Sequence, residues 1–139
     1  MSKLLAVVTG SSSGIGLQIT KDLLLKGYFV VGIDIEPCPI TDKDLRTMQC
    51  NLLDVSHTFS TAKFIENNFG PVSVLVNCAG KLDGYKTLSE IDYKDLNDII
   101  YLNLTSHVNL TKCFIDTMVE NGGGNIVNIT SVASTETGG

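Results

Sequence analysis

Apolar residues recur along this chain in short runs that alternate with longer segments of helical periodicity. Residues 4–8 form a run that is too short to span a membrane but has the length of a buried parallel strand. Apolar residues between 15 and 23 then follow at helical spacing, and Gly27 predicts the end of that helix. A second run, residues 28–33, predicts another buried strand. The chain therefore opens with a strand, a helix and a strand.

The same alternation continues through the rest of the sequence. Residues 47–50, 72–76 and 125–131 predict three further strands. Between them, one helix is expected after a cap at Asp54 or Ser56 and up to Gly70, and a longer one from about 93 to 121. Residues 41–44 are expected to begin a short helix. The positions expected to face the sheet are Phe59, Ala62, Ile65 and Phe69 in the first of these helices, and Leu96, Ile99, Leu110, Phe114 and Met118 in the longer one.

The turn between the first strand and the first helix is rich in glycine. Residues 9–16 read Thr-Gly-Ser-Ser-Ser-Gly-Ile-Gly, and such a turn points backbone N–H groups and the positive end of a helix dipole at one place, where a pyrophosphate can bind. Gly10 suits the tight turn, Gly14 the approach of a phosphate, and Gly16 the close packing of helix on strand. Because glycine-rich turns also serve as plain chain reversals, the assignment needs support from elsewhere in the chain.

An acidic residue at the end of the second strand gives that support. Asp34 follows Gly16 by 18 residues, near the spacing of about 20 expected for the acid that binds an adenosine ribose. A carboxylate accepts hydrogen bonds from both ribose hydroxyls and repels a 2′-phosphate, and Ser13 and Ile35 are uncharged where such a phosphate favours Arg or Lys. The residues therefore predict NAD in preference to NADP, with a merely solvated strand-end carboxylate as the alternative.

Residues 9–16 match the Thr-Gly-x-x-x-Gly-Ile-Gly motif, and here the sequence resembles the classical short-chain dehydrogenase/reductase family over its whole length. Residues 77–80, Asn-Cys-Ala-Gly, are similar to the family's Asn-Asn-Ala-Gly, and residues 126–131 to its Ile-Val-Asn-Ile-Ser-Ser. The resemblance implies a three-layer α/β/α Rossmann-type fold, a doubly wound parallel sheet in the order 3-2-1-4-5, and an NAD-dependent oxidoreductase that acts on alcohols or carbonyls.

The resemblance also implies roles for single residues. Asn103, which interrupts the apolar stripe of the long helix, takes the place of a catalytic Asn that holds an ordered water, although an Asn that staples the core is an equal alternative. Ser131 takes the place of the serine that binds the substrate oxygen, Asn51 that of an adenine-binding Asp, and Asn77 is expected to tie neighbouring strands together. The expected cofactor contacts are Gly10, Ser12, Ser13, Gly14, Ile15, Gly16, Asp34, Asn51, Leu52, Asn77, Ala79 and Gly80.

One motif of the family is missing from the sequence. A Tyr-x-x-x-Lys segment supplies its proton donor, whereas the tyrosines here all precede Ser131 and none has Lys four residues on. Residues 1–139 are therefore expected to be the N-terminal NAD(P)-binding part of a longer domain, truncated after the fifth strand, whose outer edge is then unpaired. The alternatives are a non-catalytic NAD-binding module, an inactive fragment, or an interaction domain that has lost the nucleotide.

Composition and charge exclude several other classes. The 139 residues, 43% of them hydrophobic and 18% charged, suit one globular domain. A net charge of −5 without any run of Lys or Arg argues against a nucleic-acid surface. Four scattered cysteines without a Cys-x-x-Cys pair predict neither a metal site nor a disulfide framework, and His107, alone on the long helix, is expected to be structural.

The remaining expectations concern location and partners. The first apolar run breaks at Thr9, before it reaches the length of a signal peptide, so a cytoplasmic protein is expected, without a membrane partner. The resemblance implies a small-molecule alcohol or carbonyl as substrate. It also implies a homodimer or homotetramer of the full-length protein, because the long helix at residues 93–121 forms subunit contacts in relatives.

Overall fold

The computed structural model describes residues 3–131, whose centre is a five-stranded parallel sheet. Its strands are β1 (Leu5–Thr9), β2 (Phe29–Asp34), β3 (Leu45–Gln49), β4 (Val72–Asn77) and β5 (Asn125–Asn128). They lie in the order β3-β2-β1-β4-β5, and every neighbouring pair is parallel. The strand order implied by the family resemblance is therefore confirmed.

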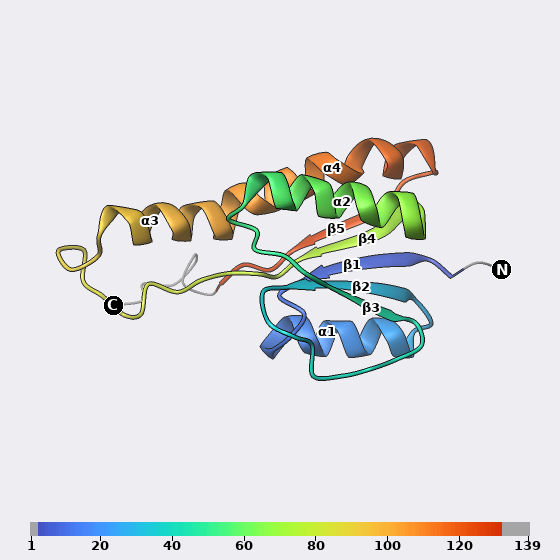
Figure 1. Cartoon of the computed structure of the whole chain (residues 1–139), viewed down its shortest axis with the longest axis horizontal. Coiled ribbons are helices and arrows are strands. Elements are labelled where there is room, and N and C mark those ends of the chain that lie inside the picture. Colours follow the sequence, from blue (N-terminus) through green and yellow to red (C-terminus); the bar gives the residue numbers. More distant parts are fainter. Residues whose placement is uncertain (1–2, 132–139) are drawn as a thin grey trace.

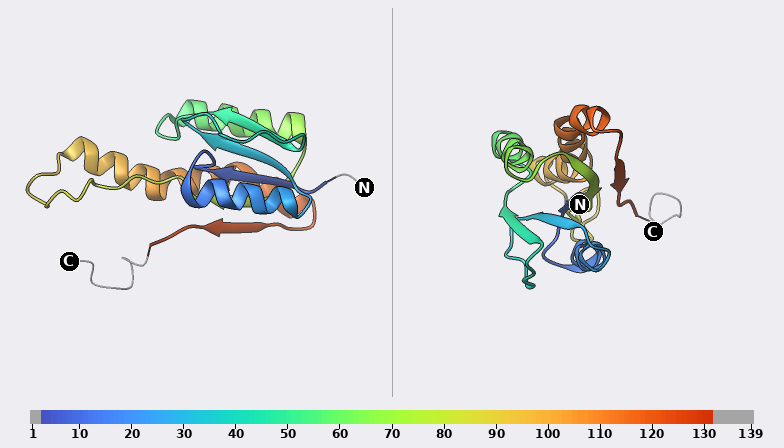
Figure 2. Two further views of the ribbon diagram at one scale, coloured as in Figure 1. Left: turned by 90° about the horizontal axis from the view of Figure 1, so that it is seen from below. Right: turned by 90° about the vertical axis from the view of Figure 1, so that its right-hand side faces the viewer.

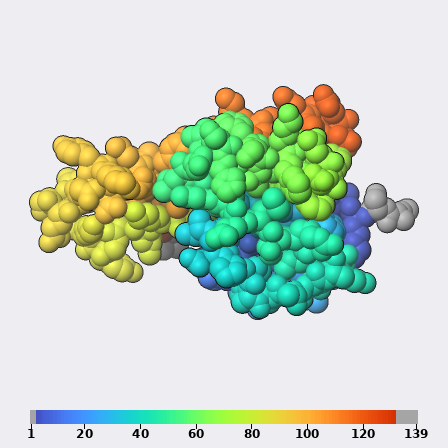
Figure 3. All heavy atoms as spheres, viewed as in Figure 1, coloured from blue at the N-terminus to red at the C-terminus, as the bar shows by residue number. Residues whose placement is uncertain are grey.

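Helices cover both faces of this sheet. α1 (Gly14–Leu25) lies on one face, and α2 (Val55–Phe69) and α4 (Ser106–Glu120) lie on the other (Figures 1 and 2). α3 (Tyr93–Ile100) and the loop before it project beyond the sheet as a separate lobe (Figure 3). The three-layer architecture is the one expected, and no helix within residues 3–131 is long and apolar enough to cross a membrane.

The side chains of β1 explain why an unbroken apolar run forms a strand here. Leu5 and Val7 pack in the core beneath α2 and α4, whereas Ala6 and Val8 pack in the core beneath α1. Successive side chains of a strand point to opposite faces, so a strand buried on both faces is apolar at every position. This pattern places the carboxyl end of β1, where the glycine turn begins, at the centre of the sheet.

The short helix expected at residues 41–44 is absent, and that prediction is wrong. A turn occupies this place instead, in which the side chain of Asp42 accepts a hydrogen bond from the backbone N–H of Asp44 at 2.8 Å. The N–H of Leu45 then bonds to the carbonyl of Asp42 and leads directly into β3. A side chain that satisfies the local backbone competes with helix formation, which explains the outcome.

The helix α2 begins as predicted, and Phe59 is the one exposed residue among the four positions expected to face the sheet. Asp54 is its cap, since its side chain accepts the N–H of His57 at 2.9 Å. Phe59, expected to face the sheet, is 43% exposed, whereas Thr58 is buried and donates its hydroxyl to the carbonyl of Asp54. Because that hydroxyl is satisfied inside the helix, threonine is tolerated on the buried face. The buried residues of α2 are Thr58, Thr61, Ala62 and Ile65, and Phe69 packs against the core that contains Ala62 and Ile65.

The long helix expected from 93 to 121 is divided. A π-helical segment, η1 (Tyr101–Thr105), joins α3 to α4. Leu110, Phe114 and Met118 are buried as predicted, but Asn103 is exposed, so the interpretation of it as a buried interruption of one apolar stripe is wrong. The wider turn changes the phase of the helix between its two halves, and such segments occur frequently at functional sites.

The fifth strand is shorter than the predicted 125–131. β5 ends at Asn128, and one further backbone bond, from Ile129 N–H to the carbonyl of Asn77, continues the pairing. β5 is the edge strand of the described sheet, and Val127 in it is exposed. The loss of regular pairing after Asn128 leaves Ser131 outside the strand.

Candidate functional site

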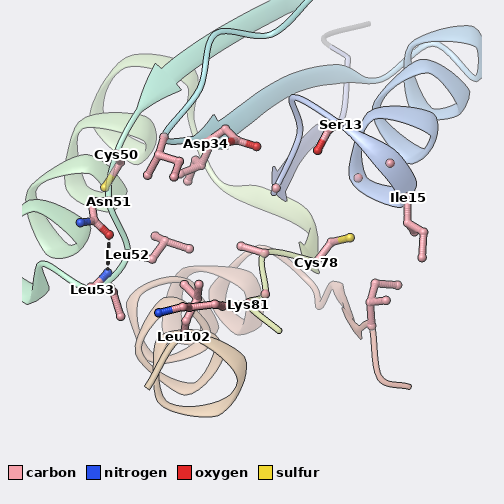
Figure 4. A pocket seen from close by; sticks show the side chains of 18 of the residues that line it. Ser13, Ile15, Asp34, Cys50, Asn51, Leu52, Leu53, Cys78, Lys81 and Leu102 are labelled. Carbon is pink, nitrogen blue, oxygen red and sulfur yellow. Dashed lines mark hydrogen bonds between the residues drawn. The ribbon is translucent and has the colours of Figure 1, made fainter. Parts of the chain in front are cut away.

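A cleft of about 770 Å³ opens at the carboxyl ends of β1, β2 and β4 (Figure 4). It lies between β1 and β4, where the chain order of the parallel sheet reverses, which is the usual ligand position in such sheets. Its walls come from four segments that are far apart in the sequence: the glycine turn, the end of β2, the end of β3 and the loop after β4. All the cofactor residues expected from the sequence line it except Ser12 and Asn77.

The three glycines of the turn are used in different ways. Gly10 has φ +68°, a left-handed conformation that suits glycine, and its N–H donates to the carbonyl of Ile33 at 2.8 Å. A Cβ on Gly16 would lie 2.1 Å from the carbonyl oxygen of Gly10, so only glycine lets α1 start this close to the turn. Gly14 has φ +51° and nothing within 4 Å of its Cβ position, which leaves open space beside it. The geometry agrees with the tasks expected of Gly10 and Gly16, whereas the approach of a phosphate at Gly14 stays a prediction.

The first turn of α1 faces this open space. Ser13 caps the helix in an extended conformation but makes no capping hydrogen bond with its side chain. The backbone N–H groups and the dipole at the start of the helix favour a negatively charged acceptor, although the N–H of Gly16 also bonds to the Cys78 thiol.

Asp34 stands at the end of β2 with both carboxylate oxygens held by the backbone. Its Oδ2 accepts the N–H of Ser12 at 2.9 Å, and its Oδ1 accepts the N–H of Glu36 at 3.0 Å. Partial burial raises the pKa of Asp34, but the hydrogen bonds from Glu36, Ser12 and Ile35 outweigh that effect and lower the pKa below its ordinary value. Asp34 therefore lies in the cleft as an ionised carboxylate with a fixed orientation.

The end of β3 forms a further wall of the cleft. Asn51 lies there with its Oδ1 accepting the N–H of Leu53 at 3.0 Å (Figure 4). The amide oxygen expected to bind an adenine amino group thus already has one partner, and its second lone pair remains. Leu52 is buried and lines the cleft next to it, and both Leu53 and Cys50 join this apolar wall.

The loop after β4 is fixed by Thr9, a residue for which the sequence pattern predicted no role of its own. The hydroxyl oxygen of Thr9 accepts the N–H groups of both Cys78 and Ala79, each at 2.9 Å. Ala79 and Gly80 line the cleft, so Thr9 connects the first strand to the opposite wall. The available signal was its place at the end of an apolar strand, where a buried hydroxyl needs partners.

Asn77 lies behind the cleft and ties two strands together, as expected. It is fully buried, and its Nδ2 donates to Oδ1 of Asn128 at 2.9 Å, which links β4 to β5. Its own Oδ1 has no hydrogen-bond partner among the described residues. Asn77 supports the wall of the cleft rather than forming it.

The two residues expected to be catalytic lie outside this wall. Asn103 grips the backbone of Lys81 on both sides, since its Oδ1 accepts the N–H at 2.8 Å and its Nδ2 donates to the carbonyl at 2.9 Å. Gly80 faces it closely, because a Cβ there would lie 3.2 Å from the Asn103 Oδ1. Ser131 is exposed, three residues after the end of β5. The structure brings Asn103 against the loop after β4 and leaves Ser131 exposed beyond the end of β5.

Lys81 is a cleft residue that no sequence pattern indicated. Its Nζ lies 3.1 Å from Oδ1 of Asp95 on α3, and Lys86 binds the other oxygen of Asp95 at 2.8 Å. These two cations, Lys86 first, lower the pKa of Asp95 to about 2. The projecting α3 is thereby connected to the edge of the cleft. Leu82, Leu102 and Ile129 line it too, from segments that only folding brings together.

Cys78 occupies the floor of the cleft beside the start of α1. Burial raises the pKa of its thiol, and a hydrogen bond from the N–H of Gly16 offsets part of that rise. The thiol is therefore neutral near pH 7. It takes the place where the resembled family has a second Asn.

Known proteins of one family are similar to this chain in sequence. The family model described as "short chain dehydrogenase" matches residues 4–139. The short chain dehydrogenase ausX of Aspergillus calidoustus is 35% identical over 132 residues, which are 92% of this chain and 51% of that protein. The 3-oxoacyl-[acyl-carrier-protein] reductase FabG of Haemophilus influenzae is 33% identical over 135 residues, which are 92% and 55%. The chain spans about half the length of the curated relatives it matches.

Solved structures show the same relationship. A short-chain dehydrogenase from Streptomyces avermitilis superposes with a TM-score of 0.90 at 26% identity. The match covers 98% of this chain and 52% of that protein. A short chain dehydrogenase from Leptospira borgpetersenii with bound NAD⁺ has a TM-score of 0.90 at 20% identity, and the match covers 100% and 56% of the two chains. The second likeness shows the fold alone.

Proposed function

This chain belongs to the short-chain dehydrogenase family, and on that premise we propose that it is the NAD-binding part of an oxidoreductase that transfers hydride between nicotinamide and an alcohol or carbonyl substrate. The observation that carries the choice of NAD is the ionised, doubly anchored carboxylate of Asp34 in the cleft. Residues 1–139 would then be the N-terminal part of one Rossmann-type domain.

The residues of the cleft fit a dinucleotide from end to end. The pyrophosphate would bind at the start of α1, where Ser13 makes no capping hydrogen bond with its side chain, against Gly14, Ile15 and Gly16. Asp34 would accept hydrogen bonds from the ribose hydroxyls, and Asn51 with Leu52 would contact the adenine. Ala79, with only a methyl side chain, and Gly80, with none, leave the backbone accessible and would face the nicotinamide half. When bound, the cofactor supplies the hydride donor or acceptor of the reaction.

The charges around Asp34 disfavour a 2′-phosphate. The carboxylate stays ionised because its pKa is lowered, and Ser13 and Ile35, which flank the same end of the cleft, carry no charge. Lys81 is the one cation among the cleft-lining residues of segment 3–131, and its ammonium group is paired with Asp95. A 2′-phosphate would therefore meet an anion without a neutralising partner, which costs binding free energy.

Two residues are proposed to serve the substrate side. Ser131 would donate its hydroxyl to the substrate oxygen, as the resemblance implies. Asn103 would hold an ordered water, because its second Nδ2 hydrogen and second Oδ1 lone pair remain after both bonds to Lys81 are made. No tyrosine lines the cleft within residues 3–131. The proposal therefore gives none of these residues the role of proton donor.

We further propose that the full-length protein is a cytoplasmic homo-oligomer. All four cysteines are free thiols, which suits a reducing compartment. Several large apolar side chains are exposed along η1 and α4, and exposed apolar surface of this kind favours association between subunits. These residues are Leu104, Val108, Ile115 and Val119.

The test is a fluorescence titration of the full chain with NADH and, in parallel, with NADPH. We expect saturable binding of NADH and at least about tenfold weaker binding of NADPH, since tenfold corresponds to roughly 1.4 kcal/mol of electrostatic discrimination. Absence of any saturable change with either dinucleotide would overturn the proposed function. Tighter binding of NADPH would overturn the choice of NAD while keeping a nicotinamide cofactor.

A further inference from the structure

A buried histidine contacts the wall of the cleft from behind. His107, in the first turn of α4, is 9% exposed, and its Nε2 lies 3.0 Å from the carbonyl oxygen of Ala79. His107 follows Asn103 by four residues, across the end of η1, and both side chains contact the loop after β4. The nearest cleft residues that they hold, Ala79 and Lys81, flank Gly80.

The peptide of Ala79 is thereby held from two elements. Its N–H donates to the Thr9 hydroxyl on β1 at 2.9 Å, and its carbonyl meets His107 on α4. Ala79 also packs against the glycine turn, since a Cβ on Gly10 would lie 3.1 Å from the Cα of Ala79. A movement of Ala79 by a few tenths of an ångström would change the width of the cleft between the turn and the opposite wall.

The contact requires a proton on Nε2 of the imidazole. A carbonyl oxygen only accepts hydrogen bonds, so the bond forms when Nε2 carries a proton. Without this donor the carbonyl of the partly buried Ala79 would lose its His107 partner, and an unsatisfied carbonyl there favours rearrangement of the loop. The donor is therefore needed for the loop to keep its position.

We propose that His107 is a positioning residue for the cofactor: through the Ala79 carbonyl it holds the Ala79–Gly80–Lys81 segment in the conformation that the nicotinamide half of NAD requires. The inference rests on the proposed function for its ligand. His107 acts through the backbone and touches neither the cofactor nor the reacting atoms. Asn103 holds the other side of Gly80, and the two together clamp the segment.

The test compares His107→Leu with His107→Gln in the full chain. Leucine fills similar space without a donor, whereas the glutamine amide can donate to the same carbonyl. Loss of one such bond should weaken NADH binding by roughly three- to tenfold in His107→Leu, and His107→Gln should restore it to within about twofold. The amides of Gly80 and Lys81 should exchange faster with deuterium in His107→Leu without any cofactor. His57→Leu, an exposed histidine on α2, is the matched control and should change neither.

Two results would overturn the inference. One is NADH affinity and amide exchange in His107→Leu equal to those of the wild type. The other, which needs no variant to fold, is a nitrogen-15 spectrum of the wild-type imidazole that shows Nε2 unprotonated at neutral pH. If wild-type protein binds no NADH but Gly80 and Lys81 still exchange faster in His107→Leu, the proposed function fails, and the role of His107 in fixing the loop is supported.

Discussion

The backbone N–H of Ser12 donates to Oδ2 of Asp34 at 2.9 Å, across 22 residues of sequence. This bond makes the glycine turn and the acid at the end of β2 one structural unit. Close packing reinforces it, because a Cβ on Gly32 would lie 2.5 Å from the Ser11 hydroxyl oxygen. The position of the carboxylate is therefore set by the same turn that would receive the pyrophosphate.

Removal of the Asp34 carboxylate should alter the choice between dinucleotides. In Asp34→Ala we expect NADH binding to weaken by about tenfold or more, because charge-assisted hydrogen bonds to the ribose are each worth about 1.5–3 kcal/mol. NADPH binding should change little or improve, since the repulsion disappears. Fluorescence titrations with both dinucleotides measure the ratio.

Asp42→Ala is the matched control for that experiment. Asp42 also accepts the N–H of the residue two positions on, but it lies in the turn before β3 and does not line the cleft. Its substitution should leave both affinities unchanged. An unchanged NADH-to-NADPH ratio in Asp34→Ala would contradict the ribose role of the acid.

The lowered pKa of Asp34 predicts a pH dependence of stability. A carboxylate whose pKa in the folded state lies below the unfolded value of 3.8 contributes stability that is present above that value and is lost as the pH falls through the folded pKa. The free energy of unfolding of the wild type should therefore exceed that of Asp34→Asn at pH 6, and the difference should shrink towards pH 3. Urea denaturation at both pH values measures it.

The contributions of all other carboxylates to the pH dependence cancel in this difference, because they are common to both proteins. The side-chain amide in the Asp34→Asn variant has a single acceptor oxygen, so it can take only one of the two backbone N–H groups that the carboxylate oxygens of Asp34 hold. A difference in unfolding free energy that stays constant from pH 6 to pH 3 would show that these bonds do not favour the ionised form.

Substitution of Gly14 should separate binding from folding. Gly14→Ala places a side chain at φ +51°, in open space beside the start of α1, and should cost roughly 1 kcal/mol of stability through backbone strain. The new methyl group should also reduce NADH affinity by tenfold or more, because it occupies the approach of the pyrophosphate. Thermal denaturation and NADH titration give the two quantities.

Gly27→Ala provides the control. Gly27 has φ +86° after the end of α1, again with nothing within 4 Å of its Cβ position, so the strain is comparable. Its stability loss should match that of Gly14→Ala while its NADH affinity stays at the wild-type value. Equal affinities in the two variants would place the pyrophosphate somewhere other than residue 14.

The Thr9 hydroxyl should be important for stability and for the cleft. Thr9→Val keeps the shape of the side chain but leaves the N–H groups of Cys78 and Ala79 without their acceptor, which should cost about 2–4 kcal/mol. Thr20→Val removes a buried hydroxyl that only donates to a carbonyl within α1, at 2.9 Å to Gly16, and should cost less than about 1.5 kcal/mol. Chemical denaturation of both variants measures the contrast, and equal losses would contradict it.

The sequence predicted the strands and most of the residues that line the cleft, and the family resemblance implied the strand order. The apolar runs specified the strands, and the glycine turn and Asp34 specified one end of the site, because both depend on local spacing and on backbone geometry. Residues 41–44 and Phe59 show the limit of such patterns. At Asp42 a side-chain hydrogen bond stabilises a turn where a helix was predicted. In α2 the hydroxyl of Thr58 bonds to the carbonyl of Asp54, and Thr58 is buried whereas Phe59 is exposed.

The contacts that hold the far wall of the cleft in place were decided by the tertiary structure. Thr9, Asn103 and His107 hold residues 78–81 through backbone atoms, and backbone atoms carry no residue identity that a sequence could reveal. The π-helical segment sets the phase at which Asn103 and His107 meet that wall, and it follows from packing rather than from periodicity. Spacing along the chain thus predicted most of the residues that line the cleft, whereas contacts between distant segments determined how those residues are held in place.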